Sequence, residues 1–312
     1  MKLETKNKYA KILLFLATLI WGSSFIVLKN AINTLPPYFV LAVRGTIAVV
    51  ILSAIFWKKF RLLTRVYIWE GAVIGTLLIA AYSFQTFGLA DSTPGKNAFL
   101  TSVYCVLVPF IYWAVTKVRP DRYNVIAAFL CVIGIGLVAL RGESFSGGQS
   151  PVATGDLLTL ISGVLYAIHI VALAKFTEGK DVILLTIIQF CFYTAIAWVM
   201  SLLFETMPSS ISLSDGASLL YLGVFATAIA LLFQSIGQKY TPASQASIIL
   251  SLEGVFGVIL SVLLYKEIVT PKLAAGFAVI FLSVLISETK MNVHPVAYLQ
   301  DVYAKITDKK NM

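Results

Sequence analysis

The sequence predicts an all-α integral membrane protein of ten transmembrane helices, on three observations. Only 12% of the 312 residues are charged and 59% are hydrophobic, whereas a soluble domain carries roughly 25% charged residues. Apolar stretches of about 20 residues, enough to cross a hydrocarbon layer of roughly 30 Å, recur along the whole chain. Turn and helix-breaking residues separate them. Membrane lipid is therefore the expected surroundings of the chain.

The ten spans follow from the apolar runs and the turn residues between them. The first run could in isolation be a secretory signal peptide, but it reaches about 17 residues, contains Trp21 and lacks a small-x-small cleavage motif. It is therefore taken as the first helix. With ends placed to within about 2–4 residues, the expected spans are 10–28, 38–57, 67–90, 97–116, 123–140, 157–174, 183–204, 217–237, 243–264 and 272–287.

Lysine and arginine are distributed unequally between the two sides of this topology. Of the 24 such residues, 18 fall on the side of the two termini, 5 on the other side, and Arg44 alone lies within a span. Basic loops stay in the cytoplasm, so both termini of this multi-pass chain are expected on the cytoplasmic face of the plasma or inner membrane. The net charge of +9 is scattered through loops and forms no stripe, which predicts no nucleic-acid partner.

The chain also repeats itself weakly at an offset of 149 residues. This offset aligns several pairs without a gap, namely Phe84-Gln85 with Phe233-Gln234, Gly88 with Gly237, Ser102 with Ser251, Val106 with Val255 and Lys117 with Lys266. Each repeat holds five spans, an odd number, so the second must be inverted relative to the first. Inverted repeats are typical of secondary transporters, whose substrate site lies near the membrane midplane between the repeats.

Specific segments then resemble a known family. WGSSF at 21–25, Arg44 and GLADSTPGKNAFLTSVYCVLVPF at 88–110 resemble the first EamA domain of the drug/metabolite transporter superfamily, and YTPASQASIILSLEGVFGVILSVLLYKEIVTPKLAAGF at 240–277 is similar to the second. The resemblance implies a central cavity and transport of amino acids, related metabolites or drugs. The family often has Glu after the fourth and ninth spans; Glu267 fits, whereas Lys117-Val118 stands at the first position.

The predicted spans and the repeat divide the chain into four parts. Residues 1–141 form the first EamA-like repeat, 142–155 an external linker, 156–288 the second repeat and 289–312 a cytoplasmic tail. After Pro295 the tail has the pattern of a basic amphipathic helix that could lie on the inner leaflet. A frayed cytosolic segment is an equally good interpretation.

Ionisable residues within spans are costly and often functional, and three of them stand out. Arg44 could bind a carboxylate substrate, or could be a snorkelling or ion-paired residue. Glu253 could couple transport to protons or bind an amine, or could join helices. His169 could titrate near neutral pH, or could be a hydrogen-bonded packing residue.

Neutral polar and aromatic residues complete the candidate cavity for a small-molecule substrate. The paired glutamines and serines could line it or could only join helices, and the aromatic residues could form its walls or could only pack the interior. The candidate substrate-binding residues are Trp21, Arg44, Tyr82, Gln85, Ser102, Tyr104, Tyr166, His169, Gln234, Ser251 and Glu253.

Other functions receive less support. No HExxH metal motif and no P-loop occurs in the sequence, and no metal, cofactor or catalytic residue is expected. The function predicted is that of a secondary transporter, an exporter of amino acids or related metabolites that works by alternating access. A carrier of drugs or organic cations, a channel and a polytopic membrane enzyme remain alternatives, and the sequence leaves the oligomeric state open.

Overall fold

The computed structural model describes residues 3–117, 119–120, 122–139 and 154–289, and these residues form helices and short connections without strands. The predicted linker up to residue 153, the tail from residue 290 with its amphipathic helix, and Arg141 lie outside this part. The all-α prediction is confirmed for the described residues.

The described residues form ten helical spans, as predicted. Eight are long and apolar enough to cross a membrane, and the shorter apolar helices α6 and α12 complete the ten. Several spans consist of consecutive helical pieces. In order they are α1 Leu3–Ile32, α2 Pro37–Ile55, α3 Arg65–Ala90, α4 Pro94–Thr101 with α5 Tyr104–Thr116, α6 Arg122–Ala139, α7 Thr154–Phe176, α8 Val182–Phe204, α9 Leu213–Tyr221 with η2 Leu222–Ile229 and α10 Ala230–Tyr240, α11 Ala243–Leu260 with η3 Ser261–Tyr265, and α12 Pro271–Thr289.

The predicted ends agree with these bounds to within four residues, with one exception. The first helix begins at Leu3 instead of residue 10, because polar residues before the apolar run continue the helix beyond it. Helix α7 begins at Thr154, so the last two residues of the predicted linker are helical. A short helical segment, η1 Trp57–Leu62, follows α2.

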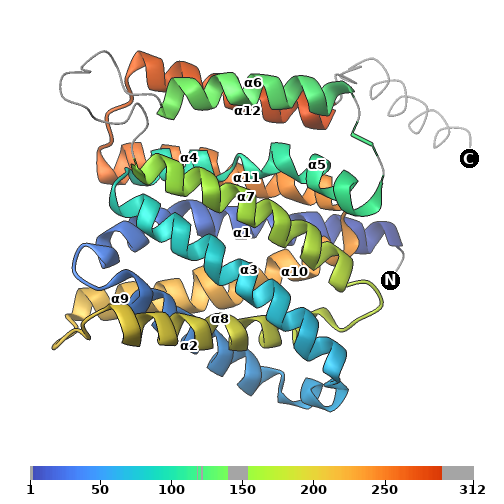
Figure 1. The fold of residues 1–312 in the computed structure, drawn as a ribbon, viewed down its shortest axis with the longest axis vertical. Helices are drawn as coiled ribbons and strands as arrows, with labels where there is room; N and C mark the ends of the chain where they lie inside the picture. Colours follow the sequence, from blue (N-terminus) through green and yellow to red (C-terminus); the bar gives the residue numbers. More distant parts are fainter. Residues whose placement is uncertain (1–2, 118, 121, 140–153, 290–312) are drawn as a thin grey trace, which may run out of the picture.

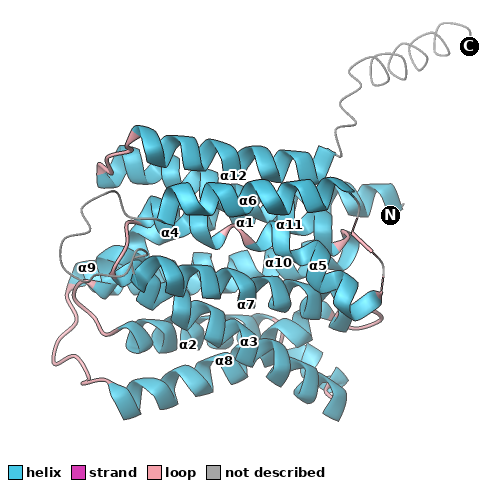
Figure 2. Ribbon diagram, turned by 45° about the horizontal axis from the view of Figure 1, so that its top comes forward, coloured by secondary structure: helices cyan, strands magenta, loops and turns pink. Residues whose placement is uncertain are grey.

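The helices lie side by side, and most close pairs join the two repeats (Figure 1). Helix α1 packs against α10 and α11, α2 against α8, and α3 against α7 and α8. Helices α6 and α12 pair with each other along one edge of the bundle (Figures 1 and 2). The interior is therefore shared between the repeats.

An unusual backbone conformation recurs at equivalent positions of the two repeats. Lys117 and Lys266 are separated by the 149-residue offset, and they are the only non-glycine residues with positive φ in the described part of the chain, at 64° and 56°. Each follows directly on its helical span. Left-handed backbone is uncommon outside glycine, so its recurrence at equivalent positions indicates that the two repeats end these spans in the same way.

A glycine allows the repeats to approach closely. On α3, a Cβ atom at Gly75 would lie 2.4 Å from the backbone oxygen of Gln189 on α8. Small residues at helix contacts are typical of membrane proteins, because they bring backbones together for dispersion contacts.

Ion pairs tie together one end of the bundle, which we call the lysine-rich side. Lys59 pairs with Asp181, and Lys180 pairs with Glu70 at 2.6 Å. The backbone nitrogens of Ile183 and Leu184 also donate to Asp181, which caps α8. Burial alone would raise the pKa of Asp181, but Lys59 and these amides outweigh burial and hold that pKa below its usual value.

Candidate functional site

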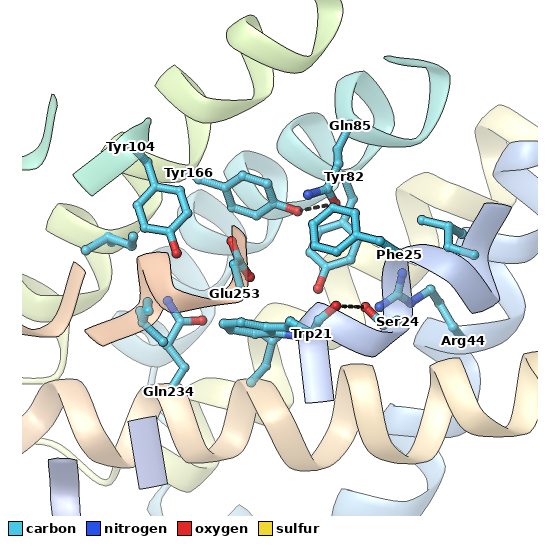
Figure 3. A pocket seen from close by; sticks show the side chains of 14 residues that line it. Trp21, Ser24, Phe25, Arg44, Tyr82, Gln85, Tyr104, Tyr166, Gln234 and Glu253 are labelled. Carbon is cyan, nitrogen blue, oxygen red and sulfur yellow. Dashed lines mark hydrogen bonds between the residues drawn. The ribbon is translucent and has the colours of Figure 1, made fainter. Parts of the chain in front are cut away.

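A cavity lies between the two repeats near the middle of the spans, and we call it the central cavity. Its volume is about 30 Å³, room for about two water molecules. Helices α1, α2, α3 and α5 of the first repeat and α7, α10 and α11 of the second contribute to its wall (Figure 3). It is lined by Trp21, Ser24, Phe25, Leu28, Arg44, Tyr82, Gln85, Tyr104, Tyr166, Ile170, Leu231, Gln234, Leu250 and Glu253.

Arg44 is the cation of this cavity. It is 2% exposed, its Nε donates to Thr227 Oγ1 at 2.7 Å, and its guanidinium carbon lies 4.6 Å from the centre of the Tyr82 ring. Neither contact neutralises the charge, and Arg44 forms no ion pair with another described residue. A guanidinium offers several donors in one plane, so nitrogens remain to bind an anion.

Glu253 is the carboxylate of the cavity. It is 6% exposed and lies within hydrogen-bonding reach of the Tyr104 hydroxyl. Figure 3 places it away from Arg44, with Trp21 and Tyr82 between them in this view. In the described part of the chain it forms no ion pair either. The cavity thus holds one basic and one acidic group, each without a charged partner.

Neutral polar groups also line the central cavity. Gln85 accepts a hydrogen bond from the Tyr166 hydroxyl at 3.0 Å and donates to Thr101 at 3.3 Å. Gln234, the repeat counterpart of Gln85, also lines the cavity. The aromatic rings of Tyr82 and Tyr166 meet edge to face, with centroids 5.7 Å apart. A ligand here would meet apolar ring edges and a few hydrogen-bonding groups, as small-molecule sites do.

A π-helical segment positions part of the wall. In η2, the Thr227 hydroxyl donates to the Leu222 carbonyl five residues earlier, at 2.7 Å, and accepts from Arg44. The neighbouring carbonyl of Ala226 accepts from Trp21 Nε1 at 2.8 Å. π-Helical turns occur frequently at functional sites. Here the turn directs two polar atoms of one repeat to the cavity residues of the other.

Eight of the eleven candidate residues line the central cavity, and three do not. Ser102 and Ser251 both line a separate small cavity with Phe99 and Val255. His169 is fully buried and hydrogen-bonds Gln189 at 3.2 Å, which is the packing interpretation.

Two residues next to the cavity were not predicted from the sequence. Thr227 accepts a hydrogen bond from Arg44, and the apolar residues around it in the sequence do not indicate that contact. Tyr193 packs edge-on against Tyr82 with ring centroids 5.7 Å apart. The repeat offset could have found Tyr193, because it is the counterpart of Arg44.

The sequence is similar to known proteins over most of its length. The chain matches the EamA-like transporter family over residues 8–140 and 153–289. The chain belongs to this family. An "Uncharacterized transporter" of Archaeoglobus fulgidus is 33% identical over 281 residues, covering 90% of this chain and 86% of the relative. The "Uncharacterized transporter YetK" of Bacillus subtilis is 25% identical over 85% of this chain and 82% of its own length.

A solved structure described as "Crystal structure of protein" has the same fold as this EamA-like chain. Its TM-score is 0.67 at 20% identity, over 89% of this chain and 96% of the other. The family establishes a multi-pass membrane transporter of the drug/metabolite superfamily, not an enzyme, that works on a small molecule in a lipid environment. No cluster of three or more metal-ligating side chains exists among the described residues.

Proposed function

We propose that this EamA-like transporter exports amino acids or closely related metabolites across the cytoplasmic membrane. The observation that carries the proposal is the presence of Arg44 and Glu253 in one small aromatic cavity, each without an ion-pair partner among the described residues. A buried charge is costly unless it is paired. A zwitterion would supply both partners at once, with its carboxylate on Arg44 and its ammonium group on Glu253.

The proposed mechanism is alternating access between the two repeats. A cavity of about 30 Å³ is too small for an amino acid, so substrate entry requires the repeats to move apart on one side. Because α1, α2 and α3 face α7, α8, α10 and α11, rocking of one repeat against the other would open the cavity to each side in turn. Glu253 would carry a proton when transport is coupled to a pH gradient.

The direction and location in the cell belong to the same proposal. The excess of Lys and Arg on the side of the termini supports a cytoplasmic lysine-rich side. Export then means loading from that side. The two repeats, residues 1–141 and 156–288, are proposed as the units that rock against each other.

Counterflow in proteoliposomes tests this function. Vesicles are loaded with one unlabelled amino acid, and uptake of the labelled form is measured across a panel of amino acids and organic cations. We expect exchange of one or a few amino acids above protein-free vesicles. Exchange of organic cations alone would favour the second candidate, a cation carrier, for which Glu253 and the rings of Trp21, Tyr104 and Tyr166 provide a binding surface.

A further inference from the structure

One end of the bundle contains a carboxylate bound to the start of a helix. Glu267 lies just after Lys266 and η3, and its carboxylate accepts from the backbone nitrogen of Gly95 at 3.0 Å and from the Thr93 hydroxyl. Ser261 also donates to it. Thr93 is the N-cap of α4 and Gly95 is the second residue of that helix. The unpaired amides at a helix start attract anions, so Glu267 shows how this fold holds a carboxylate there.

The repeat places an equivalent helix start on the lysine-rich side. The counterparts of Thr93, Gly95 and Ser261 are Pro242, Ser244 and Tyr112, and α11 begins at Ala243 with Pro242 as an N-cap that has no side-chain hydrogen bond. Val118, which lies outside the described residues, is the sequence counterpart of Glu267. At that sequence position the second helix start therefore has no glutamate equivalent to Glu267.

A cavity of about 670 Å³ surrounds the start of α11. Its wall includes Tyr112, Gln238, Thr241 and Pro242. Gln238 and Thr241 are each 3% exposed, and Gln238 Oε1 and Thr241 Oγ1 have no hydrogen-bond partner in the part of the chain that the structure describes. Buried polar groups are normally satisfied. The two atoms therefore indicate a polar ligand independently of the helix start.

Charge near the cavity favours an anion. Lys175 and Lys239 line it, and Glu178 is its one acidic residue among the lining side chains. The side chain of Ser244 occupies space that Gly95 leaves open, since a Cβ at Gly95 would lie 2.6 Å from Glu267 Oε2. A free anion can shift away from that Cβ, whereas the tethered Glu267 has less freedom to do so.

We infer that the start of α11 is a second binding site, distinct from the central cavity, for the carboxylate of a small molecule that arrives from the lysine-rich side. The amides of the first turn of α11 and the Thr241 hydroxyl donate to the carboxylate. Gln238 Oε1 accepts from a donor on the same ligand, such as an ammonium group. This site does not depend on the substrate assigned to the central cavity.

The test uses saturation-transfer NMR on the purified full chain, with acetate as probe and acetamide as its neutral counterpart. We expect transfer to acetate and little to acetamide. Thr241→Val removes the hydroxyl that donates to the carboxylate, and should lower the acetate signal at least twofold. Thr241→Ser, which keeps the hydroxyl, should leave the signal unchanged.

Arg44→Gln separates this site from the central cavity and should retain the acetate signal. Loss of the signal in Arg44→Gln but not in Thr241→Val would overturn the second site and leave the proposed function standing. Absence of acetate transfer in the wild type, or equal signals in Thr241→Val and Thr241→Ser, would also overturn it. If Thr241→Val does not elute as folded protein, Lys175→Gln, which removes a cation from the cavity wall, replaces it, with at least a twofold loss expected and an unchanged signal contradicting the site.

Discussion

The two repeats have the same architecture, but they bring opposite charges to the central cavity. At one pair of equivalent positions the first repeat has Arg44 and the second has Tyr193; at another the first has Tyr104 and the second Glu253. In each pair one repeat has a tyrosine at the position where the other repeat has a charged residue. Inverted duplication alone would give a symmetric cavity, and these two differences make it dipolar.

The tyrosine and the charged residue of each pair also have different proposed roles, the tyrosine in support and the charged residue in substrate binding. Tyr82 contacts both members of the first pair, with Arg44 over its ring and Tyr193 in an edge-to-face contact. Tyr104 reaches Glu253 across the second pair. The tyrosines therefore support the charged residues, which are the groups proposed to bind the substrate. Variants that remove one charge at a time test the comparison between the repeats most strongly.

Arg44→Gln should have the largest effect. Removing the cation leaves a bound carboxylate without its partner, a loss of about 2–5 kcal/mol in comparable buried pairs, so we expect counterflow of carboxylate substrates to fall at least about 30-fold. Arg44→Lys is the matched control, because it keeps the charge without the planar fork, and it should retain part of the activity. Counterflow unchanged in Arg44→Gln would remove Arg44 from substrate binding.

Glu253→Gln should separate coupling from binding. We expect exchange to continue while accumulation driven by a pH gradient falls to the uncoupled level, because the glutamine cannot carry a proton. Labelled uptake with and without an imposed gradient measures this. Glu178→Gln, an exposed carboxylate outside the central cavity, is the control and should accumulate substrate normally. Full accumulation in Glu253→Gln would exclude a coupling role.

Thr227→Val tests the support that the π-helical segment gives to Arg44. A hydrogen bond to a charged group contributes about 1.5–3 kcal/mol, so we expect KM for carboxylate substrates to rise roughly tenfold with kcat little changed. Thr227→Ser keeps the hydroxyl and should resemble the wild type. A fall in kcat at constant KM would show that Thr227 acts on the conformational step instead of on Arg44.

Gly75→Ala should have the smallest effect on transport and act on stability. The new Cβ would lie 2.4 Å from the Gln189 carbonyl oxygen, and such overpacking costs about 1–3 kcal/mol. We expect a lower Tm in detergent. At Gly216 a Cβ meets nothing within 4 Å, so Gly216→Ala is the matched control. Equal Tm values for the two variants would contradict a tight contact between α3 and α8.

The sequence predicted the fold well because lipid imposes simple requirements. Backbone groups in lipid must pair within each span, so apolar length and turn residues fix ten helices and their approximate ends. The breaks within spans were missed. Ser102 and Val103 separate α4 from α5, and η2 interrupts span eight, because such local geometry depends on contacts between helices and not on hydropathy.

The candidate site was predicted in part, for a related reason. Charged residues deep within spans are few, so Arg44 and Glu253 could be singled out, and aromatic residues on neighbouring spans were assigned to the same cavity. Ser102, Ser251 and His169 lie elsewhere because a polar residue in a span can equally well join helices. Thr227 could not be found, since its role depends on a π-helical turn that no residue pattern specified.

The most direct test of the dipolar cavity compares three ligands in three proteins. Counterflow is measured with the best amino acid from the panel, its amide and its deaminated acid, in the wild type, Arg44→Gln and Glu253→Gln. The wild type should prefer the amino acid over both analogues. Arg44→Gln should no longer distinguish the amino acid from its amide, and Glu253→Gln should no longer distinguish it from the deaminated acid. If both variants keep the wild-type preferences, the two residues do not bind the two ends of the substrate.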